Sequence, residues 1–311
     1  MQTRDYGPKG DRVSALGLGG AFLTQRSFAD GVATVRRALD LGVTYFDTSP
    51  MYCRGASQAV LGEALDGVGQ PHLLATKLGY FSEPAHYHNA GALAAQLGEN
   101  LRLLRRKSVD TLQLHEADMR HWWTAGAGGG GHVDLDADYD YAGAPALDFL
   151  DRCRAEGLCR FAGVSGNTAD AMTHIHRYID VDTLLLAFNY DLVRRSARRV
   201  LPAIGVKGTT RMLGAIFQRG LARPQPELLS APPEWLTPVL RRRYAELYDL
   251  QKESGLSLAA LGIRYILQQP DIACVIVGAA GPDEIEECVR AAEAGPLPDD
   301  LYERVEGLGV E

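Results

Sequence analysis

The feature that most constrains the fold is a regular alternation of short apolar segments with longer stretches of helical periodicity. Strands that alternate with helices in this way favour a parallel sheet, because each connection must cross back over the sheet. Eight segments fit a strand followed by a helical stretch, namely residues 14–20, 43–47, 72–77, 109–115, 160–165, 182–188, 211–217 and 272–278. Eight such units predict a TIM (β/α)8 barrel, in which closure buries both strand faces and removes exposed edges.

Helix signals between the predicted strands support this interpretation. Ser27 is a predicted N-cap for a segment in which Val32, Val35 and Leu39 share one helical face. Gly42 ends that segment. Leucines at positions 93, 97, 101 and 104 predict a long amphipathic helix before the fourth strand.

The main alternative is an open, doubly wound sheet with a dinucleotide-binding motif. That motif requires GxGxxG directly after the first strand. Gly17 and Gly19 match its first two glycines, but Phe22 stands where the third is needed. The sequence therefore favours the barrel over the open sheet.

Composition restricts the function classes. The chain has 311 residues, of which 46% are hydrophobic and 23% are charged, and a single barrel domain accounts for residues 1–311 without a linker. The net charge of −7 disfavours nucleic acid and anionic membranes as partners. Five cysteines without CxxC spacing, and no apolar run of membrane-spanning length, lead us to expect a soluble cytoplasmic protein. No pattern predicts an oligomeric state.

Two segments break the rhythm of strands and helices. Residues 119–143 are rich in glycine and aromatic residues, and residues 223–238 are rich in proline. Both are predicted to be long loops on the catalytic face, where long loops commonly act as lids. The glycines at 128–131 are not followed by the Lys-Ser or Lys-Thr pair of a phosphate-binding loop, so we interpret them as flexible chain.

Polar side chains end three consecutive predicted strands. Asp47, Lys77 and His115 each follow an apolar run, and Tyr52 lies five residues after Asp47. Catalytic groups of barrel enzymes come from these strand ends. Because Lys77 and Asp47 are costly to bury unless they pair, we expect them to pair beside the phenol of Tyr52 and to tune its acidity.

These residues carry a family resemblance. The segments FDTSPMY at 46–52, ATK at 75–77 and LQLH at 112–115 resemble the catalytic tetrad of aldo/keto reductases, and the likeness runs from a hairpin before residue 14 to the segment at 275–289. The loop GAIFQRGLA at 214–222 is similar to the branch with L-fucose (D-threo-aldose) dehydrogenases and pyridoxal 4-dehydrogenase.

The resemblance implies hydride transfer between a nicotinamide cofactor, NAD(P)H, and a carbonyl or alcohol carbon, without a metal. Tyr52 would be the general acid and base, and Lys77, held by Asp47, would lower its pKa. His115 would bind the substrate oxygen and orient the reacting carbon. The implied substrate is an aldose, a hemiacetal or a small aldehyde or ketone. The alternatives are a cofactor-binding regulatory protein of the potassium-channel beta-subunit type, or an NADPH-dependent carbonyl reductase of secondary metabolism.

The resemblance also implies cofactor contacts, with departures from the family pattern. Gly166 stands where many members have Asn, Ala187 replaces a Gln, and Gly214 replaces an aromatic residue. Backbone amides of the 217–221 loop would bind the pyrophosphate. The implied cofactor contacts are Gly20, Ser165, Gly166, Asn167, Phe217, Gln218, Gly220, Leu221, Gly278 and Glu284.

Two further expectations concern the cofactor preference and the substrate. Glu284 lies where many relatives have a cation for the adenosine 2′-phosphate, so its repulsion of that phosphate slightly favours NAD(H). The alternative is that another loop supplies this cation, with Arg211, Arg219 and Arg223 as the candidates. Indole faces of Trp122 and Trp123 could stack on a substrate, and Phe22 and Tyr80 could line the pocket.

Overall fold

Eight parallel strands form a closed barrel in the computed structural model, which describes residues 1–125 and 131–309. Around the barrel the strand order is β10–β3–β4–β5–β6–β7–β8–β9. The strands are β3 (Leu16–Gly19), β4 (Tyr45–Asp47), β5 (Leu73–Leu78), β6 (Val109–Leu114), β7 (Cys159–Gly166), β8 (Thr183–Ala187), β9 (Thr210–Gly214) and β10 (Cys274–Gly278). This confirms the predicted barrel and excludes the open sheet.

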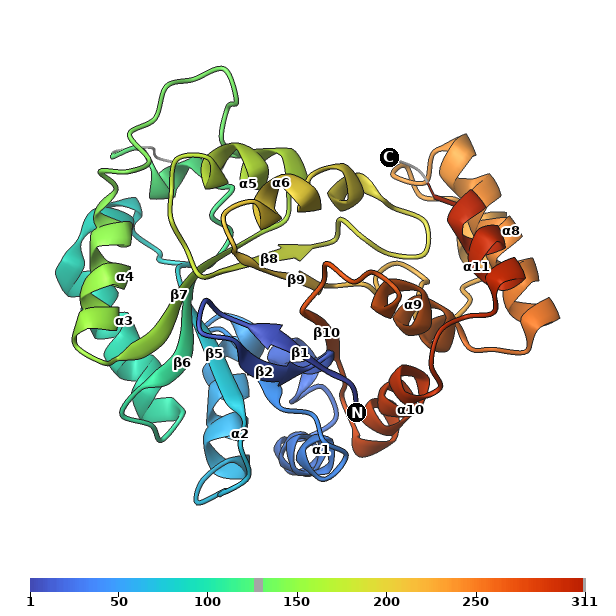
Figure 1. Cartoon of the computed structure of the whole chain (residues 1–311), viewed down its shortest axis with the longest axis horizontal. Helices are drawn as coiled ribbons and strands as arrows, with labels where there is room; N and C mark the ends of the chain where they lie inside the picture. The colour runs from blue at the N-terminus through green and yellow to red at the C-terminus, as the bar shows by residue number, and fades with distance from the viewer. Residues whose placement is uncertain (126–130, 310–311) are drawn as a thin grey trace.

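Helices surround the barrel and link its strands (Figure 1). They are α1 (Phe28–Asp40), α2 (Ala56–Ala64), α3 (Ala90–Leu103), α4 (Pro145–Ala155), α5 (Ala169–His176), α6 (Leu201–Gly205), α7 (Glu227–Ser230), α8 (Pro238–Ser254), α9 (Leu258–Leu267), α10 (Pro282–Glu293) and α11 (Asp299–Gly307). Short 3-10 helices are η1 (Gly20–Phe22), η2 (Tyr52–Gly55), η3 (Pro84–His88), η4 (Arg120–Trp122) and η5 (Ser196–Arg199). The hydroxyl of Ser27 accepts the main-chain N–H of Asp30, so the predicted cap of α1 is confirmed.

A hairpin covers the amino end of the barrel. Its strands β1 (Thr3–Tyr6) and β2 (Asp11–Ser14) pair antiparallel just before β3 begins. Tyr6 is fully buried, and its hydroxyl lies 2.7 Å from Oγ1 of Thr111, near the start of β6. The hairpin N–H of Gly7 also donates to Thr210, the first residue of β9. Since the hairpin occupies this end, a ligand must enter the barrel from the carboxyl end.

Several predicted strands extend beyond the observed ones. Phe188 and Ala215 have φ values of +66° and +55°, so the left-handed backbone ends β8 and β9 before them. Ser14 belongs to the hairpin instead of the first barrel strand. Of the two predicted loops, residues 223–238 contain the short helix α7, and residues 119–143 contain η4. Residues 126–130, which include most of the glycine run, lie outside the described residues.

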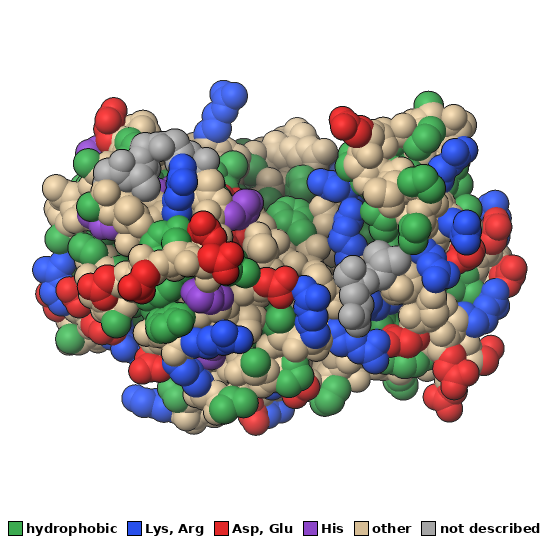
Figure 2. All heavy atoms as spheres, turned by 90° about the horizontal axis from the view of Figure 1, so that it is seen from above, with side chains coloured by type: hydrophobic (Ala, Val, Ile, Leu, Met, Phe, Trp, Pro, Cys, Tyr) green, Lys and Arg blue, Asp and Glu red, His purple; other side chains and the backbone are tan. Residues whose placement is uncertain are grey.

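The surface carries charged side chains of both signs. Acidic and basic side chains are interspersed on the face drawn in Figure 2. Among the described residues, we find no helix with the length and apolar character needed to cross a membrane.

Gly62 provides a test of the helix packing around the barrel. A Cβ at Gly62 in α2 would lie 2.2 Å from the main-chain oxygen of Leu103, which cannot move aside as a side chain would. We expect Gly62→Ala to lower the free energy of unfolding by about 1–3 kcal/mol. The matched control is Gly98→Ala on exposed α3, where no atom lies within 4 Å of the new Cβ. It should instead stabilise by about 0.5–1 kcal/mol. Urea unfolding measures both, and equal effects would contradict the packing argument.

Candidate active site

The carboxyl ends of the strands surround a cavity of about 460 Å³. Asp47 ends β4, Lys77 lies one residue before the end of β5, His115 follows β6 directly, and Tyr52 opens η2. All four side chains line the cavity. The structure thus brings together the four groups that the strand-end rule predicts, and it does so at one rim of the barrel.

A larger cavity, of about 640 Å³, lies beside the hairpin at the opposite end. Arg4, Arg12 and Arg211 line it. Each of these guanidinium groups is already bound to a main-chain carbonyl or an aspartate of the protein. Because its cations are engaged and the four functional groups are elsewhere, we place the active site at the carboxyl end.

Lys77 is fully buried at the centre of this site. Its ammonium group donates to the Asp47 carboxylate and, at 2.9 Å, to the main-chain oxygen of Thr48. Lys77 Nζ also lies 4.9 Å from the centroid of the Tyr52 ring. The expected pairing of Lys77 with Asp47 is therefore present, and the three side chains form one contacting unit.

Burial and charge act in opposite directions on this unit. Burial alone would lower the pKa of Lys77, but Asp47 and Tyr52 attract the ammonium and raise the pKa above its ordinary value. Burial raises the pKa of Tyr52, and Lys77 only partly offsets this. Lys77 thus lowers the Tyr52 pKa as expected, but lost solvation outweighs this effect and leaves the pKa above its ordinary value. Tyr52 is therefore a phenol that keeps its proton at neutral pH.

His115 is neutral and oriented by Ser49. Burial, followed by the charge of Lys77, lowers the pKa of His115 well below its ordinary value. Its Nδ1 lies 2.9 Å from Ser49 Oγ, which already accepts the main-chain N–H of Met51 at 3.2 Å. The Ser49 hydroxyl proton is thus free to be donated to Nδ1. A neutral imidazole whose Nδ1 accepts carries its proton on Nε2, which is then the donor available to a ligand.

Unusual backbone conformations cluster around the cavity. Tyr80, Glu116, Phe188 and Ala215 all follow barrel strands, line the cavity and have φ between 51° and 66°. Left-handed backbone costs a non-glycine residue about 1–2 kcal/mol. Such strain gathers where a surrounding structure imposes it, and functional sites are its common location. This supports the placement of the site independently of the four polar groups.

The structure divides the implied cofactor contacts into two groups. Six of them line the cavity, namely Ser165, Gly166, Asn167, Phe217, Gln218 and Gly278. Gly20, Gly220, Leu221 and Glu284 are not part of its lining. Leu221 is fully buried, and its N–H donates to the Gln218 oxygen at 3.1 Å. The expectation that this amide binds an anion is therefore wrong, because the turn already uses it.

The aromatic residues proposed for the substrate also differ in location. Phe22 and Tyr80 line the cavity, and the Tyr80 ring packs edge-on against His115 at 4.8 Å. Trp122 and Trp123 are buried, and neither lines the cavity. Their indole N–H groups donate to the main-chain oxygens of His115 and Ala117, at 2.9 and 2.7 Å. The expectation that they stack on a substrate is wrong, since both indoles are used to hold the chain after β6.

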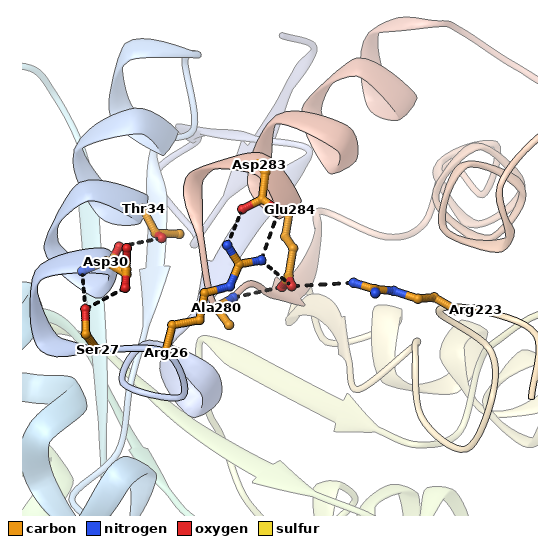
Figure 3. Close-up of polar contacts among 8 residues, drawn as sticks. All are labelled: Arg26, Ser27, Asp30, Thr34, Arg223, Ala280, Asp283 and Glu284. Carbon is orange, nitrogen blue, oxygen red and sulfur yellow. Dashed lines mark hydrogen bonds and ion pairs between the residues drawn. The ribbon is translucent and has the colours of Figure 1, made fainter.

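Glu284 belongs to a network of ion pairs that joins three segments of the chain (Figure 3). Arg26 binds Asp283 at 2.6 Å and Glu284 at 2.9 Å, and Arg223 lies 3.6 Å from Glu284. The Glu284 carboxylate also accepts the N–H of Ala280 at 2.9 Å. Two cations and two carboxylates balance here, so the repulsion expected from Glu284 is offset by its own arginine partners. The network links the segment before α1, the start of α10 and the loop after β9.

Sequence reasoning missed two residues of the site, Ser49 and Glu116. Both lie close to predicted residues in the sequence, since Ser49 is two residues after Asp47 and Glu116 directly follows His115. Glu116 lines the cavity and accepts a hydrogen bond from Asn167 at 2.8 Å. Their position next to strand ends was the available signal, but a side chain's direction there depends on the backbone after the strand.

Comparisons with known proteins agree with this geometry. The aldo/keto reductase family model matches residues 15–309. The chain belongs to the aldo/keto reductase family. Curated relatives include L-galactose dehydrogenase of Arabidopsis thaliana, 27% identical over 94% of this chain and 88% of that protein. D-threo-aldose 1-dehydrogenase of a Pseudomonas species is 25% identical over 88% of each chain.

A solved structure shares the fold. The holo form of an aldo-keto reductase from Bacillus halodurans superposes with a TM-score of 0.77, at 24% identity, over 99% of this chain and 96% of that one. The aldose dehydrogenases among the relatives match the branch that the 214–222 loop indicates. This membership places the chain in a family of oxidoreductases.

Removal of one member of the buried pair tests how this aldo/keto reductase site is held. Lys77→Met leaves the Asp47 carboxylate buried without its cation, so we expect a loss of about 3–5 kcal/mol in the free energy of unfolding. The double variant Asp47→Leu/Lys77→Met removes both charges and should recover most of that loss. Urea unfolding followed by circular dichroism gives both values. A double variant as unstable as the single one would show that the pair does not act as a unit.

Proposed function

We propose that this protein is an NAD(P)-dependent oxidoreductase that transfers a hydride between a nicotinamide and the carbonyl or alcohol carbon of a small substrate. The observation that carries the proposal is the buried Lys77, which is bound to Asp47, contacts the Tyr52 ring in the wall of the cavity and lies beside a neutral His115. A charged ammonium, a protonated phenol and an imidazole donor around one cavity form a set suited to polarising and protonating a carbonyl oxygen.

The cavity residues fit a nicotinamide riboside. Leu185 and Ile276 give the cavity apolar wall on which a flat ring can rest. Asp47 Oδ2 is buried and has no hydrogen-bond partner in the part of the chain that the structure describes. It can therefore accept a hydrogen bond from a hydroxyl group of a ligand. Ser165 and Asn167 offer side-chain groups for a carboxamide. When bound, the coenzyme supplies or accepts the hydride.

Each residue of the site then has one task. In reduction, the Tyr52 hydroxyl gives its proton to the substrate oxygen, and Lys77 stabilises the phenolate that remains. In oxidation, the same phenolate takes the proton back. His115 donates from Nε2 to the substrate oxygen, and Ser49 keeps Nδ1 as the acceptor. The raised Tyr52 pKa supports the acid role in the protein before a substrate binds.

The substrate class we propose is an aldose or hemiacetal, or a small aldehyde or ketone. The names of the aldose dehydrogenase relatives support a sugar-like substrate. A cavity of about 460 Å³ is in the range of small-molecule sites.

For the coenzyme, we propose a slight preference for NAD(H). Glu284 stands where the family resemblance places the adenosine end, and it pairs with Arg26 and Arg223. A 2′-phosphate would therefore compete with an existing carboxylate for these arginines. The physical reason for the preference is thus competition for two cations, and no longer simple repulsion by Glu284.

The variant Tyr52→Phe tests the proposed chemistry. It removes only the phenolic oxygen, so we expect turnover of glyceraldehyde with the preferred coenzyme to fall at least about 100-fold. Coenzyme affinity, measured by isothermal titration calorimetry, should stay within about twofold, because the ring remains. Unchanged turnover would remove Tyr52 from the mechanism. Failure of the wild-type protein to bind either NADH or NADPH would overturn the redox assignment itself.

The variant Glu284→Gln tests the coenzyme preference. It releases Arg223 and leaves Arg26 with Asp283 as its one carboxylate partner in this network, so we expect NADPH affinity to rise about fivefold relative to NADH affinity. The matched control is Glu286→Gln on the same helix, which loses its contact with Arg37 instead and should leave that ratio unchanged. Calorimetric titrations with each coenzyme give the ratios. An unaltered ratio in Glu284→Gln would show that the network lies away from the adenosine end.

A further inference from the structure

The charges that line the cavity do not balance. Among the described residues, the lining contains one cation, Lys77, and two carboxylates, Asp47 and Glu116. Lys77 is already bound to Asp47, so one plus and two minus charges leave Glu116 as the uncompensated group. Glu116 forms no ion pair within residues 1–125 and 131–309. A ligand that fills this cavity therefore meets a single net negative charge.

The carboxylate of Glu116 is held in place by neutral partners. Asn167 donates to its Oε1 at 2.8 Å, and Glu116, after burial, contributes to raising the pKa of the neighbouring Tyr80 phenol above its ordinary value. A carboxylate has about four acceptor positions, so these contacts leave capacity for a ligand. Neither neighbour neutralises the charge, and both of them line the cavity as well.

The backbone on both sides of Glu116 is fixed. Trp122 binds the main-chain oxygen of His115, and Trp123 binds that of Ala117. The N–H of Ala117 donates to the Ser165 oxygen at 2.7 Å. Glu116 itself has a φ of +51°, where Gly or Asn would be less strained. These main-chain hydrogen bonds thus hold a strained, charged residue against the cavity. A carboxylate that only faced solvent would not need such fixed backbone on both sides.

We propose that Glu116 is a specificity-determining residue that excludes anionic carbonyl compounds from the site and admits uncharged, hydroxyl-bearing ones. The inference rests on the proposed function, since it concerns the substrate of the same site. An anionic substrate would lie in a low-dielectric cavity where Lys77, the one cation of the described lining, is already paired, so the repulsion of the substrate by Glu116 is poorly screened. A neutral substrate with hydroxyl groups can instead donate hydrogen bonds to the free acceptor positions of the carboxylate.

A matched pair of substrates tests whether Glu116 discriminates against a negatively charged substrate. Succinic semialdehyde and its methyl ester share one chain and one aldehyde but differ by a single negative charge. We expect the wild-type protein to reduce the ester with a kcat/KM at least about tenfold higher. Glu116→Gln keeps an acceptor for Asn167 and removes the charge, so the two substrates should become nearly equal. Glu116→Asn is the second neutral variant, because Asn tolerates left-handed backbone if Gln impairs folding.

The controls separate this inference from the proposed function. Glu83→Gln removes the same charge at an exposed position outside the cavity lining, and it should keep the wild-type ratio. A ratio that stays at the wild-type value in both Glu116 variants, or a wild-type protein that reduces the two substrates equally well, would overturn the inference alone. Absence of turnover of either substrate with NADH and NADPH would overturn the proposed function, and this inference with it.

Discussion

The buried contact between Lys77 and Asp47 is the interaction on which the site depends. The two residues come from neighbouring strands, since Asp47 pairs in register with Ala75 and Lys77 with Gln113. Barrel closure excludes water from both side chains, so each charge is tolerated only because the other is present. That same exclusion keeps the proton on Tyr52, which Lys77 contacts. Stability and reactivity at this rim therefore have one physical origin.

The chain after each strand decides what the cavity can recognise. Tyr80, Glu116, Phe188 and Ala215 adopt left-handed backbone just where their strands end, and each of them then lines the cavity. Favourable contacts of neighbouring residues offset this strain, and the clearest example is the pair of hydrogen bonds from Trp122 and Trp123 to the main chain around Glu116. In this way residues that never meet the ligand set the position of those that do.

Periodicity and strand-end polarity were enough to predict the barrel, the capped helix α1 and the group formed by Asp47, Tyr52, Lys77 and His115. Those signals are local, and barrel geometry converts them into one site. The roles expected for Trp122, Trp123 and Leu221 were wrong because their indoles and amide are consumed by nearby main-chain oxygens. Nothing in the order of residues reveals which donors the folded chain has already used.

Charge balance shows the same division between sequence and structure. The sequence by itself determined the fold class, the family resemblance and the four polar residues that meet in the cavity, because these follow from spacing along one chain. Only the tertiary structure decided that Glu284 shares Arg26 and Arg223, that Tyr52 has a raised pKa, and that Glu116 has no cation partner among the residues that the structure describes. The physical reason is that electrostatic energies depend on distance and burial, and the partners come from segments that are far apart in the sequence.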